Sequence, residues 1–143
     1  MNILFVCTGN TCRSPMAEAI LKHISQGETQ VKSAGVFAVN GNEASPHAKM
    51  VMDIKGIKHN HSSAQVTGEM VEWASYIFTM TNQHKQMLHA FYPNAGEKIY
   101  TLKEFVGSDE MDVLDPFGGS VKIYEQTYDE LFQQIQKLHN KLR

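Results

Sequence analysis

The chain has 143 residues, of which 42% are hydrophobic and 20% charged, and its formal net charge is −2 at pH 7. This length suits one domain over residues 1–143 with a packed core, and the composition excludes a disordered chain. The small negative charge argues against a nucleic-acid partner, and neither a leader sequence nor an apolar run long enough for a membrane span is visible, so we expect a cytoplasmic protein without a membrane partner.

Short apolar runs alternate with helical patterns along the chain. The first run, residues 2–6, predicts a buried strand, and the polar residues 7–13 predict a loop. A helix should then begin with Ser14 near its cap and Pro15 in its first turn. Further strands are expected at 30–34, 76–80 and 98–102, and further helices from Ser45 to before Gly56, in a short segment from Thr67, over 82–91 and over 120–141.

The long last helix has an apolar face that we expect to be buried. Ile123, Tyr124 and Tyr128 lie on this face. The two tyrosines also fit a surface for a partner protein, and the sequence alone leaves both interpretations open.

Strands that alternate with helices predict a parallel sheet covered on both faces. Right-handed crossovers and short connections favour a single-domain, three-layer α/β sandwich with a four-stranded flavodoxin-like sheet of order 2-1-3-4. Ligands of such sheets bind beyond the carboxyl ends of the strands, at a point where the strand order reverses. The loop after the first strand lies there and is the candidate site.

Two cysteines, Cys7 and Cys12, are the only ones in the chain, and both lie in this loop. A disulfide across so short a loop would constrain the unfolded chain little. A zinc site needs about two more ligands at suitable spacing, which the sequence lacks, so we expect no metal. Two thiols on one loop of an intracellular protein indicate reactive chemistry.

The loop reads Cys-Thr-Gly-Asn-Thr-Cys-Arg-Ser over residues 7–14. A tight loop that leads into a helix turns successive backbone N–H groups inward, and the helix N-terminus adds a positive end, so the loop can hold an oxyanion. Gly9 lets the backbone fold closely, and Asn10 tolerates a left-handed conformation. The candidate phosphate-binding residues are Thr8, Gly9, Asn10, Thr11, Cys12, Arg13 and Ser14.

Cys7 and Arg13 make this loop a candidate active site. Arg13 can bind two phosphate oxygens through its planar guanidinium. Cys7 would lie beneath the phosphorus, where the amides, the helix dipole and the guanidinium lower the pKa of a thiol from about 8.5, and Ser14 is placed to donate a hydrogen bond to the sulfur. Taken alone, a cysteine at the end of a core strand is more often a small buried hydrophobe. A nucleotide-binding Walker loop is excluded because no Gly-Lys-Ser/Thr follows.

The segment Cys-Thr-Gly-Asn-Thr-Cys-Arg-Ser-Pro-Met-Ala-Glu-Ala from Cys7 resembles the low-molecular-weight protein tyrosine phosphatase family. Residues 33–35 (Ser-Ala-Gly) resemble its second-strand motif, and residues 114–119 (Leu-Asp-Pro-Phe-Gly-Gly) resemble its late Asp-Pro loop. The resemblance implies that Cys7 is the nucleophile of a cysteinyl-phosphate intermediate and that Arg13 and the loop amides bind the phosphoryl group. It also implies that Asp115 acts as general acid and then as general base.

The resemblance implies no metal and no other cofactor, because Arg13 and the amides supply the positive charge. Without it, Asp115-Pro116 indicates only a turn. Cys12 resembles the family's second loop cysteine, which implies a reversible disulfide with oxidised Cys7. A small buried filler is the equally good alternative for Cys12.

Thr11 indicates the substrate. Phosphotyrosine-directed members usually have an apolar residue there, commonly Ile, whereas Thr resembles the bacterial branch that removes phosphate from arginine side chains. A hydroxyl can serve a polar guanidinium, while Ile would leave a donor unpaired. Phe117 and Phe37 are candidate walls of the pocket. Both also fit ordinary core or loop aromatics, and this alternative is the better one for Phe37 but weaker for Phe117, which lies close to Asp115.

We therefore expect a monomeric protein phosphatase that acts on phosphoarginine in proteins and releases inorganic phosphate. A phosphotyrosine phosphatase is the alternative. An arsenate reductase would need further cysteines after Cys12, and a phosphate sensor would not need Cys7 and Asp115 together. The seven histidines are expected to be exposed and without a role.

Overall fold

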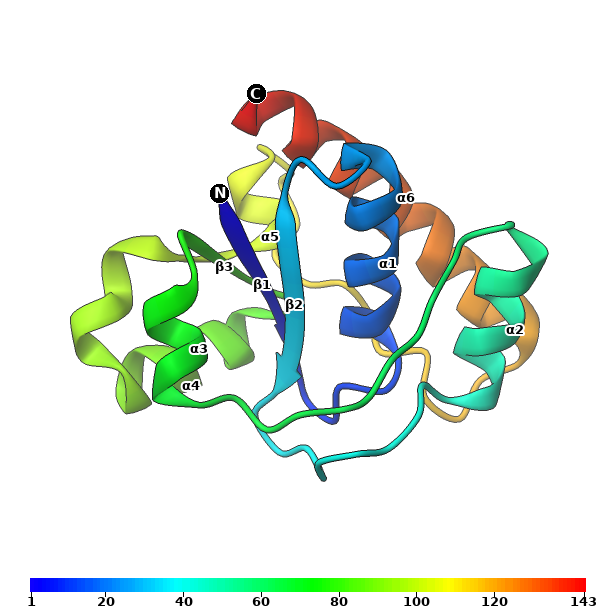
Figure 1. The fold of residues 1–143 in the computed structure, drawn as a ribbon, viewed down its shortest axis with the longest axis horizontal. Helices are drawn as coiled ribbons and strands as arrows, with labels where there is room; N and C mark the ends of the chain where they lie inside the picture. Colours follow the sequence, from blue (N-terminus) through cyan, green and yellow to red (C-terminus); the bar gives the residue numbers. More distant parts are fainter.

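Helices cover both faces of one parallel sheet in the computed structural model, which describes residues 1–143 (Figure 1). The strands are β1 (Asn2–Cys7), β2 (Gln30–Gly35), β3 (Tyr76–Thr79) and β4 (Ile99–Thr101). The helices are α1 (Arg13–Ser25), α2 (Pro46–Ile54), α3 (Gly68–Trp73), α4 (Asn82–Phe91), the 3-10 helix η1 (Pro93–Lys98), α5 (Leu102–Phe105) and α6 (Val121–Leu142). The strand order β2-β1-β3-β4, parallel throughout, confirms the predicted α/β fold. No helix is long and apolar enough to span a membrane.

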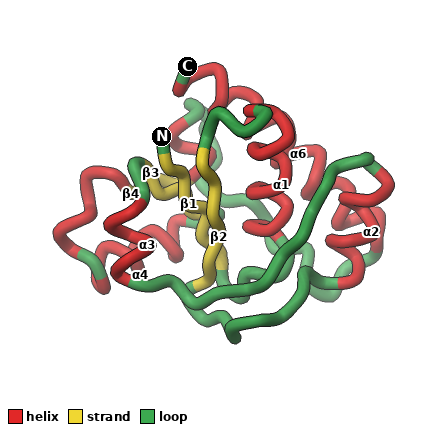
Figure 2. The backbone as a smooth tube through the Cα atoms, in the orientation of Figure 1, coloured by secondary structure: helices red, strands yellow, loops and turns green.

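The central strand β1 contributes side chains to two separate apolar clusters, because successive side chains of a strand point to opposite faces. Ile3 and Phe5 pack in a cluster with residues of α1, α2 and α6. Leu4 and Val6 pack in a second cluster with residues of α3 and α4. Figures 1 and 2 show these helix groups on opposite sides of the strands. The nearly continuous apolar run of β1 follows from this double burial.

Most helices begin at a capping hydroxyl, and α2 and α3 begin at the residues where the sequence predicts a helix start, Ser45 and Thr67. In each case the Ser or Thr side chain accepts a hydrogen bond from the backbone N–H three residues later, which satisfies one of the free donors of the first turn. The caps are Ser45 of α2, Thr67 of α3, Thr81 of α4, Thr101 of α5 and Ser120 of α6.

The structure corrects the predicted start of α1. The cap position is Cys12, whose side chain makes no capping hydrogen bond, and Ser14 lies within the first turn. The Ser14 hydroxyl contacts Cys7 and Asn10 instead. Among the α-helices, the only one without a capping side chain is therefore the helix that begins at the candidate site.

Two further differences concern the end of the sheet and the last helix. The strand predicted at 98–102 is shorter, because Thr101 and Glu104 form a capping box that draws Leu102 into α5. Ile123 is exposed although it was predicted to be buried, whereas Tyr124 and Tyr128 belong to the core. The two tyrosines are therefore not a surface for a partner.

Candidate active site

The loop that joins β1 to α1 lies at the carboxyl end of the sheet (Figure 1). Neighbouring backbone holds it in place: the N–H of Val36 donates to the carbonyl of Cys7 at 3.0 Å, and that of Phe37 to the carbonyl of Thr8 at 2.9 Å. Asn10 has a φ of 58°, the left-handed conformation that the sequence predicted. This conformation reverses the chain between the strand and the helix.

Asn10 is fully buried and ties the loop to three other segments. Its amide Nδ2 donates to the Ser14 Oγ at 2.7 Å and to the Ser33 Oγ at 3.0 Å. Its Oδ1 accepts from the N–H of Ala64 at 2.9 Å, and its carbonyl accepts from the Nε2 of His61 at 2.6 Å. The side chains of Asn10 and Ser14 thus support the loop from behind, and neither lines the cavity in front of it.

Gly35, the last residue of β2, lets the loop approach the sheet. A Cβ at this position would overlap the carbonyl oxygen of Thr8 and lie 3.1 Å from the backbone nitrogen of Asn10. Only glycine allows so close an approach. In the sequence, the only signal for Gly35 is the family resemblance of residues 33–35.

Cys7 is almost completely buried at the base of the loop, with its Sγ 2.8 Å from the Ser14 Oγ. Because Asn10 already donates to the Ser14 oxygen, the Ser14 hydrogen is free to point at the sulfur, which favours the thiolate. Burial nevertheless raises the pKa of the Cys7 thiol, and it outweighs the hydrogen bonds from Ser14 and the charge of Arg13, which lower that pKa. The predicted net lowering is therefore wrong, because desolvation is the largest effect.

A cavity of about 270 Å³ opens in front of the Cys7 thiol. It brings together two motifs that lie about a hundred positions apart in the sequence, the loop and the Asp-Pro segment. Phe117 stands at its rim with 80% of its surface exposed, whereas Phe37, the other predicted wall, does not line it. The lining residues are Cys7, Thr8, Gly9, Thr11, Cys12, Arg13, Asp115 and Phe117.

Arg13 and Asp115 place opposite charges in this cavity. The guanidinium of Arg13 is buried; its Nη1 donates to the carbonyl of Val113 at 2.9 Å, and its Nη2 lies 3.7 Å from the Asp115 Oδ2. The other oxygen of Asp115 accepts from the N–H of Phe117 at 3.0 Å, in the turn that the sequence indicates. A buried cation with free N–H groups can hold an oxyanion, and a half-exposed carboxylate beside it can exchange protons with a bound group and water.

Cys12 is buried on the side of the loop that faces α6. Its Sγ lies 3.3 Å from the hydroxyl of Tyr124 and 3.5 Å from that of Ser45. Burial, followed by the contact with Cys12, raises the pKa of Tyr124 to about 12, so this hydroxyl keeps its proton. Both cysteines are free thiols in the structure, and both line the cavity.

Two histidines contact the loop, which contradicts the expectation that all seven are exposed and without a role. His84 is buried, and its Nε2 lies 2.8 Å from the Thr8 Oγ1. His61 contacts the carbonyl of Asn10. These contacts span 76 and 51 positions of the chain, and no local pattern in the sequence indicates them.

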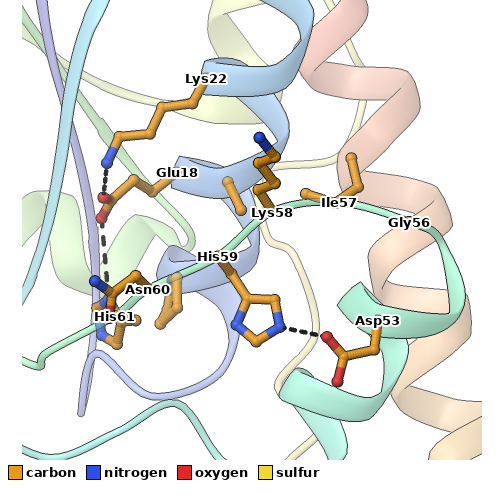
Figure 3. Close-up of a pocket in the computed structure, with 11 residues that line it drawn as sticks. Glu18, Lys22, Asp53, Gly56, Ile57, Lys58, His59, Asn60 and His61 are labelled. Atoms are coloured by element: carbon orange, nitrogen blue, oxygen red, sulfur yellow. Dashed lines mark hydrogen bonds and ion pairs between the residues drawn. The ribbon is translucent and has the colours of Figure 1, made fainter.

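A larger cavity lies elsewhere, between α1 and the segment 56–61 (Figure 3). Its volume is about 720 Å³, and most of the residues that line it are polar. Figure 3 shows Glu18 between Lys22 and His61, and His59 directed at Asp53. The Nε2 of His59 lies 2.7 Å from the Oδ1 of Asp53. No cysteine lines this cavity, so we assign the chemistry to the smaller one, where a thiol, a guanidinium and a carboxylate meet.

Comparisons with known proteins agree with this assignment. The family model described as low molecular weight phosphotyrosine protein phosphatase matches residues 2–143. The chain is 50% identical over 141 residues to a protein-arginine-phosphatase of Geobacillus stearothermophilus, covering 99% of this chain and 95% of that protein. It is 43% identical to the low molecular weight protein-tyrosine-phosphatase PtpB of Staphylococcus haemolyticus (strain JCSC1435), covering 96% of this chain and 97% of that protein.

Among solved structures, the chain resembles a C7S mutant of the YwlE arginine phosphatase whose active-site serine is phosphorylated. The TM-score is 0.96 and the sequence identity 48%, and the match covers 99% of this chain and 95% of the other. The likeness therefore extends over the whole fold and includes the loop that carries the thiol.

Proposed function

The chain belongs to the low molecular weight phosphotyrosine protein phosphatase family, and we propose that it removes phosphate from arginine side chains of proteins. The observation that carries the proposal is the cavity in which the Cys7 thiol, the Arg13 guanidinium, the Asp115 carboxylate and the Thr11 hydroxyl meet. The near full-length identity to an arginine phosphatase supports it.

In the first step, the phosphoryl group enters the loop and its oxygens bind the loop amides and the free N–H groups of Arg13. Cys7 attacks phosphorus in its thiolate form, which Ser14 and Arg13 favour, so an S–P bond forms while the P–N bond to the substrate guanidine breaks. Asp115 in its protonated form gives its proton to the departing nitrogen, and arginine leaves as a guanidinium. The phosphorylated serine in the C7S mutant of the related enzyme supports a covalent intermediate at this position.

In the second step, water attacks the phosphorus of the cysteinyl-phosphate. Asp115, now a carboxylate, takes a proton from the water, the S–P bond breaks, and inorganic phosphate leaves. Ser14 and Arg13 stabilise the thiolate that is released, because both favour the charged form of Cys7. The same carboxyl group thus acts in both steps, as its partial exposure allows.

Thr11 is the proposed determinant of the substrate. Its side chain lines the cavity together with Asp115, so a guanidinium bound there meets a hydroxyl and a carboxylate as hydrogen-bond partners. An isoleucine at this position would leave a guanidinium N–H unpaired, at a cost of about 1–3 kcal/mol. A phenol ring has no N–H group to lose and would tolerate the change.

The test compares two peptides of one sequence, one with phosphoarginine and one with phosphotyrosine at the same position. We expect the wild-type protein to have the higher kcat/KM on phosphoarginine, and Thr11→Ile to lose about tenfold or more on that peptide only. Cys7→Ser, which removes the nucleophile, is the control for contaminating activity. Equal losses on both peptides would contradict the assigned role of Thr11, and a wild-type preference for phosphotyrosine would overturn the proposed substrate.

A phosphotyrosine phosphatase is the second candidate. The 43% identity to a protein-tyrosine-phosphatase favours it, and so does the exposed ring of Phe117 at the rim of the cavity, which suits an aromatic substrate. The same pair of peptides decides between the two functions.

We further propose a cytoplasmic monomer whose partners are phosphorylated proteins, with no nucleic acid and no metal. The redox proposal is that peroxide oxidises Cys7 to a sulfenic acid, and that the Cys12 thiol then attacks this sulfur, which forms a Cys7–Cys12 disulfide while the thiol proton leaves with the displaced hydroxyl group as water. The position of both thiols on one cavity supports it. In Cys12→Ser, activity should no longer return when a thiol reductant follows peroxide; unchanged recovery would leave Cys12 as a buried filler.

A further inference from the structure

His84 is a buried histidine that the reaction described above does not use. It lies in the first turn of α4, with 5% of its surface exposed, and its backbone N–H donates to the Thr81 hydroxyl. Its Nε2 lies 2.8 Å from the Oγ1 of Thr8, the first residue after Cys7. Thr8 lines the cavity, so His84 contacts the site through this hydroxyl.

The proton of His84 can be assigned from its surroundings. Its Nδ1 is buried and has no hydrogen-bond partner. A buried N–H without an acceptor is rarer in proteins than a buried acceptor without a donor, so the hydrogen is assigned to Nε2. Burial, followed by the charge of Arg13, lowers the pKa of His84 to about 4, against the opposing charges of Asp112 and Asp115. The ring is therefore neutral at pH 7 and donates its single N–H to Thr8.

This assignment determines what the Thr8 hydroxyl can offer. Its oxygen accepts one hydrogen bond from His84, which leaves one lone pair and its own hydrogen. Both remaining groups are available to a molecule in the cavity. A hydroxyl without the His84 contact would be free to rotate and would offer neither group in a fixed direction.

We propose that His84 is a positioning residue that holds the Thr8 hydroxyl as a paired donor and acceptor for the N–P group of phosphoarginine. The inference rests on the proposed function. Phosphoarginine carries a guanidine N–H next to phosphoryl oxygens, so one hydroxyl can accept from the nitrogen and donate to the oxygen. The bridging oxygen of phosphotyrosine has no hydrogen, so only the second of these contacts can form. The Thr8–His84 pair thus favours the P–N substrate.

The test uses two substitutions of His84 and the paired peptides. His84→Leu fills a similar volume but removes the donor, whereas the Nε2 of His84→Gln reaches about as far as that of histidine. We expect His84→Leu to lower kcat/KM on phosphoarginine about tenfold and that on phosphotyrosine less than about threefold, and we expect His84→Gln to keep most of both. His89→Leu, on the same helix and away from the loop, should change neither.

Thr8→Val supplies a second, independent variant. It removes the hydroxyl and should reproduce the selective loss on phosphoarginine. The double variant Thr8→Val/His84→Leu should be no worse than Thr8→Val, because His84 acts only through Thr8. Losses that multiply in the double variant would overturn this relation.

The outcomes separate this inference from the proposed function. Wild-type turnover of phosphoarginine with equal losses on both peptides in His84→Leu, or a loss that His84→Gln does not rescue, would overturn the inference alone. Absence of phosphoarginine turnover by the wild-type protein would overturn the proposed function, and the inference with it.

Discussion

The loop of the candidate active site and the capped start of α5 are two short polar segments that differ in where their hydrogen-bond partners lie along the chain. In α5, Thr101 accepts from the N–H of Glu104, and the Glu104 carboxylate accepts from the N–H of Thr101, so both bonds of the capping box join residues three positions apart. One further bond, from Lys85 to the Glu104 carboxylate, reaches this segment from elsewhere in the chain. In the loop, Asn10 bonds Ser33 and Ala64, which lie 23 and 54 positions away. The loop therefore depends on the assembled fold, and a change far along the chain can reach the thiol, whereas a change at α5 should alter stability alone.

The strongest test of this difference is Gly35→Ala. The added Cβ overlaps the carbonyl oxygen of Thr8, which is backbone and cannot rotate away. We expect a free energy of unfolding lower by about 3 kcal/mol and a kcat/KM lower by about a hundredfold, because the loop must shift. Thermal unfolding and peptide hydrolysis measure the two effects.

Gly68→Ala is the matched control, since a Cβ there meets its nearest heavy atom, in the ring of Tyr92, at 3.9 Å. Gly68 opens the short helix α3, so alanine should leave activity unchanged and stability equal or slightly higher. An active and stable Gly35→Ala protein would show that the loop does not need this close approach.

Asn10→Ala should have the next largest effect. Alanine resists the left-handed conformation by about 1–2 kcal/mol and leaves the partners of the amide unpaired, so we expect a loss of about 2 kcal/mol in stability and about tenfold in kcat. Gln26, which is also left-handed but exposed, provides the control: Gln26→Ala should cost less than about 0.5 kcal/mol.

Asn10→Gly separates the two causes, because glycine accepts the left-handed conformation but makes no side-chain hydrogen bonds. We expect it to recover part of the stability and little of the activity. Full recovery of activity in Asn10→Gly would show that the polar network behind the loop has no effect on the chemistry.

Ser14→Ala tests the link between this network and the thiol. Ser14 lowers the pKa of Cys7 against the larger effect of burial, so its removal should raise that pKa further and reduce the thiolate fraction at pH 7. We expect alkylation of Cys7 by iodoacetamide to slow about tenfold, with the pH dependence displaced to higher pH. Cys12→Ser should serve as background, so that only Cys7 reacts.

Ser25→Ala is the control for this measurement. Its hydroxyl lies buried in the same helix without a hydrogen-bond partner. The rate of alkylation should stay at the wild-type value, and stability should not fall. A slower reaction in both variants would assign the effect to the helix rather than to Ser14.

Glu104→Gln should have the smallest effect, and on stability alone. Burial raises the pKa of Glu104, but hydrogen bonds from Lys85 and Thr101 outweigh it, and the net pKa lies below the ordinary value. The carboxylate therefore stabilises the fold above the unfolded-state pKa of about 4.3, and this contribution is lost as the pH falls through the folded-state pKa. We expect a loss of about 1 kcal/mol at pH 7 that shrinks toward pH 3, with unchanged kcat/KM.

Glu69→Gln makes the same chemical change at an exposed position outside the capping box, and its loss of stability at pH 7 should be smaller than that of Glu104→Gln. Denaturant unfolding at both pH values measures the effect. A fall in kcat/KM of Glu104→Gln would contradict the expectation that a change at α5, unlike a change at the active-site loop, alters stability alone.

The sequence by itself determined the order of the strands and of the longer helices, the starts of α2 and α3, and the left-handed turn at Asn10. These features depend on neighbouring residues or on the periodicity of apolar side chains, which a linear pattern records. The sequence predicted too long a strand in place of β4 and gave no sign of α5, because the capping box of Thr101 competes with the strand for the same residues.

Only the tertiary structure decided which polar side chains surround the thiol. Ser33, His61 and His84 reach the loop from three separate segments. The family resemblance of residues 33–35 includes Ser33, but nothing near the two histidines in the sequence distinguishes them from exposed polar residues. The same is true of the pKa of Cys7: the loop carries every group that lowers it, but the extent of burial, which raises it, depends on how α1 and the sheet pack. Hydrogen bonds to a buried group depend on distances in the folded structure, whereas the sequence shows only which donors and acceptors are available.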